Sequence, residues 1–363
     1  MHKVGFVGWR GMVGSVLIDR MLAENDFDKN IDPTFFTTSQ AGEAAPSIGI
    51  NLPVLVDAHD LNALSKMDII LTCQGSDYTK KVLSPLRQKG WDGFWIDAAS
   101  ALRMDDNSII VLDPLNRTQI DSAIQNGIKN FIGGNCTVSL MMLAISGLLN
   151  ANLVEWVSSM TYQAISGAGA KAMQELLAQM GYLTQNIQSN NIIELEQQLR
   201  QKIQSDDFPK HVINNSLALN LLPWIDSAVE NGQTREEWKA CAEMNKILQS
   251  KNNIPVDGIC VRVSSLRSHS QALTIKLKED IPLDEINSLI KNGNKWVKLV
   301  ENNKDATFKD LTPISTSGSL DIAVGRVKKT NISPYHINLF TVGDQLLWGA
   351  AEPLRRVLNI LTK

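Results

Sequence analysis

The stretch 5-GFVGWRGMVG-14 decides the fold of the first half of the chain. Gly8, Gly11 and Gly14 directly follow a short apolar run that predicts a buried strand, and residues 11–24 have the apolar spacing of a helix. Glycines at such a turn let the backbone approach a pyrophosphate, and the helix N-terminus supplies oriented N–H groups. A tight turn with close packing would explain the glycines alone, but the strand before them and the helix after them favour a nucleotide site.

Strand–helix alternation continues from this stretch up to about residue 134. A series of this kind predicts an α/β fold, here a Rossmann-type parallel sheet with helices on both faces. The predicted strands are residues 3–8, 33–39, 67–73, 93–99, 108–113 and 131–135, and the later predicted helices are residues 77–90 and 116–127.

The pattern changes beyond Cys136, where longer helices and strands with polar alternation follow. Residues 260–266 and 272–278 predict two such strands, so we expect an α+β second domain whose sheet has one solvated or ligand-lined face. Residues 184–211 are polar and rich in Gln and Asn, which predicts a surface helix with flexible flanks. The last residues, from 348 to the C-terminus, predict an amphipathic helix.

The composition of the chain argues against several classes of function. It has 363 residues, enough for two domains, and a formal net charge of −3, which argues against a nucleic-acid partner. The sequence has no apolar run of membrane-spanning length, and its start has no signal-peptide pattern, so we expect a cytoplasmic protein. The four cysteines have no CxxC spacing, which argues against a zinc site or a disulfide framework, and we expect no metal.

The end of the second predicted strand indicates which cofactor the first domain binds. NAD-binding domains usually place a carboxylate there for the ribose 2′-hydroxyl, whereas this chain reads 35-FFTTSQ-40. Thr38 and Ser39 can donate hydrogen bonds to a 2′-phosphate, and Arg10 can add positive charge. NADP is therefore favoured over NAD, unless the carboxylate comes from elsewhere in the chain.

Cys136 follows the last predicted strand of the first domain and opens a helical apolar pattern. The positive end of a helix dipole stabilises a thiolate, so we expect a lowered pKa for this thiol. A free cysteine is more often a small buried hydrophobe. Here, however, it lies where open α/β sheets bind ligands, which favours attack on an aldehyde followed by hydride transfer from the thiohemiacetal.

Four further side chains have both a functional and an ordinary explanation. Among the five histidines, only His269 lies in a polar stretch between two predicted strands, where it could serve as a base or be a surface residue. Arg262 alternates with valines and could bind a carboxylate or face solvent. Glu236 and Lys239 lie three residues apart on a helix that begins with a Thr234–Glu237 capping box, and from spacing alone they form an exposed ion pair.

Long motifs of the chain resemble the aspartate-β-semialdehyde dehydrogenase family, in its bacterial branch. The resemblance extends from residue 3 to the C-terminus and weakens only around residues 185–215, where the chain is more polar. The motifs are residues 5–17 (GFVGWRGMVGSVL), 71–79 (LTCQGSDYT), 95–104 (WIDAASALRM), 131–142 (FIGGNCTVSLMM), 161–170 (TYQAISGAGA), 235–248 (REEWKACAEMNKIL), 254–278 (IPVDGICVRVSSLRSHSQALTIKLK) and 340–356 (FTVGDQLLWGAAEPLRR).

The resemblance implies an activity and the residues that perform it. The reaction is the NADP-dependent interconversion of L-aspartate 4-semialdehyde plus phosphate with 4-phospho-L-aspartate, on the route to lysine, threonine and methionine. Cys136 would be the acyl-thioester nucleophile, and His269 the proton acceptor for the thiol and the hemithioacetal. Arg262 would bind the α-carboxylate, Glu236 the amino group, and Gln163 would orient the substrate.

Phosphate and cofactor ligands are also implied by the resemblance. Arg103 and Lys239 would bind phosphate, and Ala168 stands where the family often has glycine. The residues implied to contact NADP, together with those favoured by the glycine motif and the second strand, are Gly8, Arg10, Gly11, Met12, Val13, Thr38, Ser39, Gln74, Ser166, Gly167, Ala168, Gly169, Ala170 and Gln345.

Domain organisation follows the same resemblance. Residues 1–134 with 352–363 would form the NADP-binding domain, and residues 135–351 the catalytic and dimerisation domain of a homodimer or of a tetramer. N-acetylglutamyl-phosphate reductase and glyceraldehyde-3-phosphate dehydrogenase share this layout but differ around the cysteine. A non-catalytic NADP sensor is a further alternative, but it leaves the combination of Cys136, His269 and two basic residues unexplained.

Overall fold

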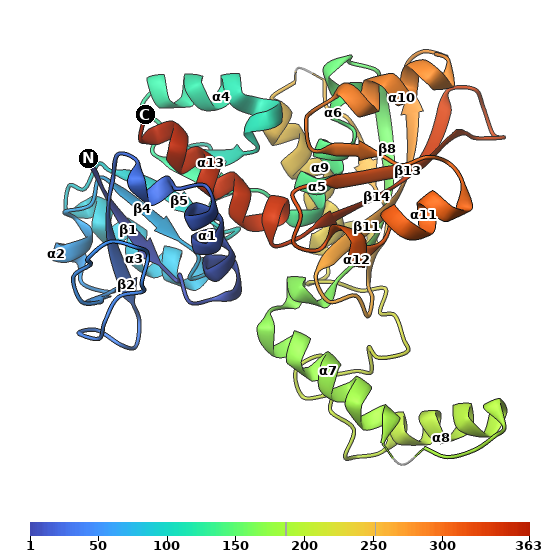
Figure 1. Cartoon of the computed structure of the whole chain (residues 1–363). Helices are drawn as coiled ribbons and strands as arrows, with labels where there is room; N and C mark the ends of the chain where they lie inside the picture. The colour runs from blue at the N-terminus through green and yellow to red at the C-terminus, as the bar shows by residue number, and fades with distance from the viewer. Residues whose placement is uncertain (186, 251) are drawn as a thin grey trace.

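A computed structural model describes residues 1–185, 187–250 and 252–363 (Figure 1). Its first sheet has seven strands in the order β3-β2-β1-β4-β5-β7-β6, and every pair is parallel, as the strand–helix alternation predicts. Strand order reverses between β1 and β4, which is where open α/β sheets bind ligands. The strands are β1 (His2–Val7), β2 (Ile31–Thr37), β3 (Val56–Asp57), β4 (Ile69–Thr72), β5 (Phe94–Asp97), β6 (Ser108–Val111) and β7 (Asn130–Gly133).

Helices cover both faces of this sheet. One face carries a core built with α1 (Met12–Ala23), α4 (Asp113–Gln125) and α13 (Glu352–Leu361), and the other carries a core built with α2 (Leu61–Leu64) and α3 (Ser76–Gln88). The C-terminal helix α13 lies across the first sheet although it follows the second domain in sequence, and its apolar stripe is buried there (Figure 1). The amphipathic pattern of the last residues is thus explained by this contact.

The second sheet is mixed, with the order β10-β8-β11-β14-β13-β12, and β9 pairs with β8. Its central strands are antiparallel, and one face packs on α5 (Cys136–Ala144), α6 (Ser146–Asn150), α9 (Arg235–Leu248) and α10 (Leu283–Asn292). The α+β prediction for this half is therefore confirmed. The strands are β8 (Val154–Gln163), β9 (Val256–Asp257), β10 (Cys260–Arg262), β11 (Ser268–Leu277), β12 (Val297–Leu299), β13 (Ile322–Lys329) and β14 (His336–Asp344).

Two strand predictions in this half are wrong at their ends. The strand expected over 260–266 ends at Arg262, and the strand expected over 272–278 already begins at Ser268. The polar residues at the start of β11 are buried rather than solvated: Gln271 Nε2, for example, donates a hydrogen bond of 2.9 Å to the carbonyl of Thr137. His269 therefore lies within a strand and not in a connecting loop.

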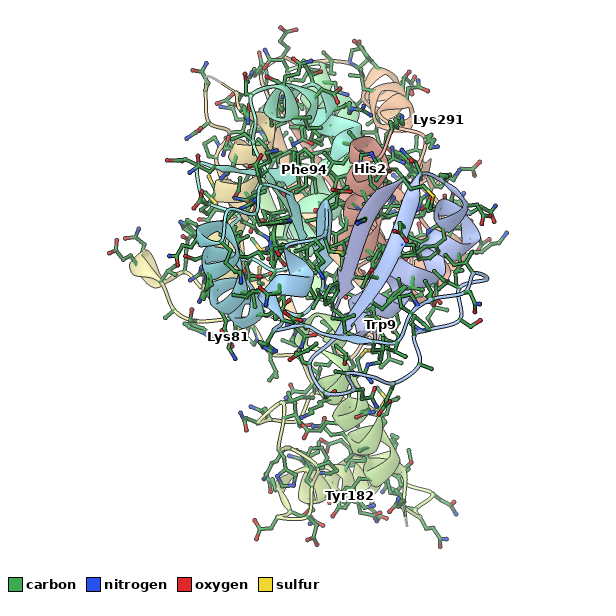
Figure 2. The ribbon with its side chains drawn as sticks, turned by 90° about the vertical axis from the view of Figure 1, so that its left-hand side faces the viewer. His2, Trp9, Lys81, Phe94, Tyr182 and Lys291 are labelled. Carbon is green, nitrogen blue, oxygen red and sulfur yellow. The ribbon has the colours of Figure 1, made fainter. Side chains whose placement is uncertain are left out.

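A separate arm projects from the second domain (Figures 1 and 2). It comprises α7 (Ala170–Thr184), α8 (Ile192–Gln204) and the chain that follows, around a small core that includes Leu176 and Phe208. The surface helix predicted over 184–211 is confirmed for α8, which has no fully buried residue among those described, but residue 186 of that segment lies outside the described residues. Within the described ranges, none of the helices is both long and apolar enough to cross a membrane.

Short elements complete the fold. They are the 3₁₀ turns Asp26–Asp28, Ile165–Ala168 and Glu230–Gly232, the π-helical turn Leu347–Ala351 (η4), and the helices α11 (Lys304–Asp310) and α12 (Pro313–Thr316). The π-turn lies at the site, because it joins β14 to α13 beside Cys136. Turns of this type often occur at functional sites.

Candidate active site

Cys136 is the first residue of helix α5, directly after strand β7. Asn135 is the N-cap of this helix, and its side-chain oxygen accepts hydrogen bonds from the backbone N–H groups of Thr137 (3.0 Å) and Val138 (3.2 Å). Capping by Asn satisfies amides that the first helical turn leaves without partners. The sequence-based placement of the thiol at a helix N-terminus is therefore correct.

His269 lies against this thiol, with its Nε2 atom 3.3 Å from Cys136 Sγ. Its other ring nitrogen, Nδ1, accepts a hydrogen bond of 2.9 Å from the backbone N–H of Ala164. A neutral imidazole has one donor and one acceptor nitrogen, so this hydrogen bond assigns the proton to Nε2. The neutral ring thus presents an N–H group to the sulfur.

The pKa of the Cys136 thiol is raised, whereas the sequence predicts that it is lowered. Desolvation raises the pKa of the Cys136 thiol to about 12, and the nearby Glu236 carboxylate acts in the same direction, while Arg103 and Arg262 oppose them. Desolvation also lowers the pKa of His269 to about 3, with Arg262 adding to the effect. The expected lowering of the thiol pKa by the helix N-terminus is therefore wrong for the free protein, because the cost of burying a charge outweighs it.

Arg262 approaches the same pair from strand β10. The side chain is buried, and its Nη1 atom donates a hydrogen bond of 2.8 Å to the carbonyl of Ala164, the residue whose N–H binds His269. A solvent-facing arginine, the ordinary explanation of its alternation with valines, is therefore excluded. Gly167 leaves room for this side chain, because a Cβ atom there would lie 2.9 Å from Arg262 Nη1.

Arg103 is a second buried cation of the site and is held on three sides. Its Nε donates to the carbonyl of Gly133 (2.7 Å), its Nη2 donates to that of Ala98 (3.4 Å), and its Nη1 lies 3.1 Å from Glu243 Oε1. The other oxygen of Glu243 accepts a hydrogen bond of 2.6 Å from the backbone N–H of Asn135. The buried carboxylate of Glu243 therefore positions both Arg103, a predicted phosphate ligand, and Asn135, the residue before Cys136.

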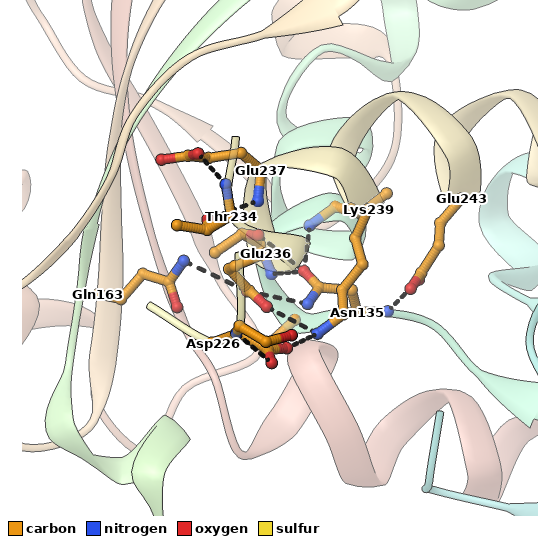
Figure 3. Close-up of polar contacts among 12 residues, drawn as sticks. Asn135, Gln163, Asp226, Thr234, Glu236, Glu237, Lys239 and Glu243 are labelled. Carbon is orange, nitrogen blue, oxygen red and sulfur yellow. Dashed lines mark hydrogen bonds and ion pairs between the residues drawn. The ribbon is translucent and has the colours of Figure 1, made fainter. Parts of the chain in front are cut away.

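Lys239 and Glu236 form a buried pair on the first turns of α9 (Figure 3). Lys239 Nζ lies 3.0 Å from Glu236 Oε2 and 2.8 Å from Asp226 Oδ2. The other oxygen of Glu236 accepts hydrogen bonds from Asn135 Nδ2 (2.9 Å) and Gln163 Nε2 (3.3 Å). The exposed ion pair that spacing alone favours is therefore wrong, since both side chains face the site.

The predicted capping box of α9 is confirmed. Thr234 Oγ1 accepts from the backbone N–H of Glu237 (3.3 Å), and a Glu237 carboxylate oxygen accepts from the N–H of Thr234 (2.6 Å). The second oxygen of Glu237 binds the N–H of Cys260 (3.1 Å) on strand β10. This cap positions α9 against the strand that carries Arg262.

A cleft of about 520 Å³ lies between the two sheets and is lined by Cys136 and the charged side chains around it, whereas His269 and Glu243 are not among its lining residues. The cleft also reaches the start of α1 at Val13, the start of α3 at Gly75 and Ser76, and the π-turn at Gly349 and Ala350. The thiol thus borders the loops that follow β1 and β4, where strand order reverses. The predicted site residues that line this cleft are Val13, Arg103, Cys136, Gln163, Gly167, Glu236, Lys239, Arg262 and Gln345.

A neighbouring groove of about 580 Å³ has the features of a dinucleotide site. Gly8 has a positive φ of 73°, and a Cβ atom there would lie 2.6 Å from Gln74 N; a Cβ on Gly14 would lie 2.3 Å from the carbonyl of Gly8. Only glycine fits at these two positions, so the backbone stays open to a phosphate group. The groove is lined by Gly8, Trp9, Arg10, Gly11, Phe36, Thr37, Thr38, Cys73 and Gln74.

Arg10 occupies the end of the groove where a 2′-phosphate would lie. Its Nη2 atom donates to Thr37 Oγ1 (2.9 Å) and to Ser39 Oγ (3.1 Å), and the guanidinium lies 5.5 Å from the centre of the Trp9 ring. The residues present here, two hydroxyl groups and a guanidinium at the end of β2, fit a phosphate better than a ribose hydroxyl.

The remaining predicted cofactor residues lie in three places. Ser166 Oγ donates to Gln345 Oε1 (2.8 Å), so these two residues form a contact between the 165–168 turn and the chain after β14. Ala168, Gly169 and Ala170 lead from that turn into α7, away from the lining of the cleft. Met12 is the first residue of α1, at the glycine turn.

Some residues of the site were missed by the sequence analysis. Glu243 had a usable signal, since it lies seven residues after Glu236 and therefore on the same face of α9. Asp226 and Gly349 had none, because an irregular segment and a turn from the far end of the chain bring them to the cleft. Cys73 lines the coenzyme groove beside Asp97, and burial raises its pKa, which does not favour a second reactive thiol.

Comparison with known proteins places these features in a family. Residues 3–123 match the model described as "Semialdehyde dehydrogenase, NAD binding domain", and residues 145–348 match "Semialdehyde dehydrogenase, dimerisation domain". Aspartate semialdehyde dehydrogenase from Francisella tularensis is 57% identical, with all of both chains covered and a TM-score of 0.97.

More distant structures share the fold. Aspartate semialdehyde dehydrogenase II from Vibrio cholerae, described as complexed with ASA, is 22% identical over 99% of this chain and 98% of that one, with a TM-score of 0.82. The enzyme from Candida albicans, described as with NADP, is 14% identical over 99% and 98% of the two chains, with a TM-score of 0.65.

Proposed function

The chain belongs to the semialdehyde dehydrogenase family, and on that premise we propose that it interconverts L-aspartate 4-semialdehyde plus phosphate with 4-phospho-L-aspartate, using NADP. The observation that carries this proposal is the contact of 3.3 Å between Cys136 Sγ and His269 Nε2, in a cleft that also holds three buried cations. A thiol nucleophile accounts for aldehyde oxidation, and two separate anion sites account for a carboxylate and a phosphate.

The first step is attack of a Cys136 thiolate on the aldehyde carbon. The thiol first releases its proton to solvent in the cleft, and Arg103 and Arg262 are the groups that favour its charged form. The carbonyl oxygen becomes an alkoxide, and we assign to His269 Nε2–H the hydrogen bond that stabilises it. When hydride leaves the same carbon, the C=O bond re-forms as a thioester, so this step needs no proton acceptor.

This assignment changes the role that the resemblance implies for His269. A ring whose Nδ1 already accepts a hydrogen bond from Ala164 has no free acceptor nitrogen for the thiol proton while it is neutral. It is therefore proposed as a donor to the sulfur and to the alkoxide. The low pKa of the ring agrees with a group that stays neutral through the cycle.

NADP, when bound, supplies the nicotinamide that accepts hydride from the thiohemiacetal. Gly8, Gly11 and the N-terminus of α1 would hold its pyrophosphate, while Arg10 and Ser39 would hold the 2′-phosphate. These residues fit the group because Gly8 lines the groove and a Cβ atom there would collide with the backbone of Gln74, so the groove stays open beside the glycine turn.

Substrate groups are divided among the charged side chains. Arg262 binds the α-carboxylate through its planar fork, Glu236 accepts from the substrate ammonium group, and Gln163 lies beside Glu236 to orient the chain. Arg103 and Lys239 bind the phosphate that attacks the thioester. Attack forms the acyl phosphate and returns the sulfur as a thiolate.

The same family membership supports a homodimer formed through the second domain, and we propose a cytoplasmic location. Met160 and Tyr162 on strand β8 are exposed large side chains on the open face of the second sheet. Burying such side chains against a second copy would be favourable.

Kinetics of three variants test the assignment of the two anion sites. Arg262→Lys keeps the charge but loses the fork, so the semialdehyde KM should rise and kcat should fall, while the phosphate KM stays unchanged. Lys239→Met and Arg103→Leu should instead raise the phosphate KM by roughly tenfold or more, because a charge-assisted contact of about 1.5–3 kcal/mol is lost.

A pre-steady-state experiment separates phosphate binding from acyl-enzyme formation. Without phosphate, Lys239→Met should still release a burst of NADPH no larger than the enzyme concentration, while Cys136→Ala should release none. If Lys239→Met changed only the semialdehyde KM, the phosphate assignment would be wrong. If Cys136→Ala retained turnover, the proposed chemistry would be wrong as a whole.

A further inference from the structure

Lys239 already binds two carboxylates before any phosphate arrives (Figure 3). One of them, Glu236, has further partners in Asn135 and Gln163 and a proposed role toward the substrate ammonium group. The other, Asp226, lies 2.8 Å from Lys239 Nζ, lines the cleft, and has no role in the mechanism above. Its position beside a phosphate ligand calls for an explanation.

The backbone holds Asp226 in an unfavourable conformation. Its φ of 72° lies in the left-handed region, which costs free energy for most residues other than glycine and is tolerated best by Asn and Asp. The segment is fastened on both sides: Leu222 pairs with Arg262 through hydrogen bonds of 2.8 and 3.0 Å, and the carbonyl of Ser227 accepts from the N–H of Arg235 (2.7 Å). Trp224 Nε1 also donates to the carbonyl of Asp226 (2.9 Å). The carboxylate is thus presented to Lys239 by a fixed segment.

Arg103, the other proposed phosphate ligand, also binds a carboxylate, but that carboxylate is held in place permanently. Its carboxylate, Glu243, is 2% exposed and also binds the N–H of Asn135, so it cannot leave without breaking the cap region of α5. The Asp226 side chain is 34% exposed, and among the residues that the structure describes its second oxygen binds only the backbone N–H of the next residue, Ser227 (2.8 Å). A rotation of this side chain releases Lys239 without disturbing α5.

We propose that Asp226 is an internal anion that occupies Lys239 when phosphate is not bound, and that it sets the affinity of the enzyme for phosphate. This inference rests on the proposed function, because it takes Lys239 as a phosphate ligand. A phosphate dianion and the carboxylate compete for one ammonium group and repel each other across it. Asp226 therefore weakens phosphate binding and favours phosphate release when the reaction runs toward the semialdehyde.

Asp226→Asn tests the proposal, because asparagine tolerates the left-handed conformation and keeps the size of the side chain. Removing the carboxylate that competes with phosphate for Lys239 should lower the phosphate KM by about tenfold. The inhibition constant of phosphate in the reductive direction should fall by a similar factor, and the semialdehyde KM should stay constant. An unchanged or higher phosphate KM, or a change confined to the semialdehyde, would overturn the proposal.

Two further variants separate this proposal from its premise. Glu230→Gln removes a charge from the same segment at an exposed position and should leave both constants unchanged. In a Lys239→Met background, Asp226→Asn should lose most of its effect on the phosphate KM, because Lys239, for which Asp226 and phosphate compete, is gone. If Lys239→Met alone left the phosphate KM unchanged, the phosphate assignment itself would fail. If it raised that KM and Asp226→Asn did not lower it, only the role of Asp226 would fail.

Discussion

Gly349 offers a direct test of how precisely the nucleophile is placed. A Cβ atom on this residue would lie 2.7 Å from Cys136 Cβ and 3.2 Å from Cys136 Cα. Carbon atoms in ordinary contact lie about 3.5–4.0 Å apart, so Gly349→Ala requires a displacement of about 1 Å. The colliding atoms belong to the first turn of α5 and not to the end of a flexible side chain.

The turn that carries Gly349 has little freedom to retreat. On one side of it, Trp348 is buried in the core of the second domain and packs edge to face against Trp296, with the two ring centroids 4.5 Å apart. On the other side, Leu354 and Val357 of α13 are buried on the first sheet. Cys136 must therefore absorb much of the shift. A misplacement of about 1 Å at a reacting atom costs on the order of 100-fold in rate, so kcat should fall by about that factor.

Stopped-flow acyl-enzyme formation and NADP binding should be measured on Gly349→Ala together with thermal unfolding. We expect a slow burst of NADPH and a nearly unchanged affinity for NADP. The free energy of unfolding should fall by about 1–3 kcal/mol because of overpacking. Gly181→Ala is the matched control: it lies in α7, a Cβ there meets nothing within 4 Å, and alanine should stabilise the helix by roughly 0.5–1 kcal/mol without changing kcat. A Gly349→Ala enzyme with parental kcat would refute the argument.

Two more predictions concern the cofactor and the thiol. Ser39→Asp should raise the KM for NADP far more than that for NAD, because a carboxylate beside Arg10 would repel a 2′-phosphate; steady-state kinetics with both cofactors measure this, and an unchanged preference would mean that Arg10 acts without Ser39. Because the pKa of the Cys136 thiol is raised to about 12, its thiolate fraction and its alkylation by iodoacetamide should increase about tenfold per pH unit between pH 7 and 9. Mass spectrometry of the labelled peptide follows this rate, which should show no inflection near the usual pKa of histidine because desolvation keeps His269 neutral. A rate that is already constant above pH 7 would show that the thiolate forms more readily than the structure indicates.

Apolar patterning predicted the first sheet well because its strands are buried on both faces. The strand expected from residue 33 in fact begins at Ile31, although Pro33 cannot donate to a neighbouring strand. The sheet accommodates this proline because β3 pairs with β2 only at Phe36 and Thr37, which leaves the outer side of β2 free at Pro33. The two-residue strand β3 is too short to leave an apolar pattern.

Prediction was poorer where polar side chains face the interior. The start of β11 looks like a loop because Ser268 and Ser270 flank His269, yet all three residues are buried within the strand. Sequence spacing likewise suggested a surface pair for Glu236 and Lys239. In both cases the polar groups are satisfied by partners distant in sequence, namely Ala164 for His269 and Asn135 for Glu236, which periodicity cannot reveal.

The predicted lowering of the pKa of the Cys136 thiol was wrong for a related reason. A helix N-terminus can be predicted from sequence, and Asn135 does cap the helix as that prediction requires. The desolvation that opposes the dipole depends on how closely the two domains and the π-turn enclose the sulfur, and no local pattern reports it. Cofactor and substrate binding would change that enclosure, so the thiol is best tested with and without them.

Helix α9 explains how acyl transfer and nucleophile placement are coupled. Glu236, Lys239 and Glu243 lie at positions i, i+3 and i+7, so one face of the helix carries the proposed ligands of the substrate ammonium group and of phosphate together with the carboxylate that binds Arg103. The same face holds Asn135 at two points, through its backbone N–H and its side-chain amide. Any motion of α9 that moves the phosphate ligands must also move the cap of the helix that begins with the nucleophile. In the proposed mechanism, the attacking phosphate and the thioester carbon would therefore be kept in register by one helix rather than by independent side chains.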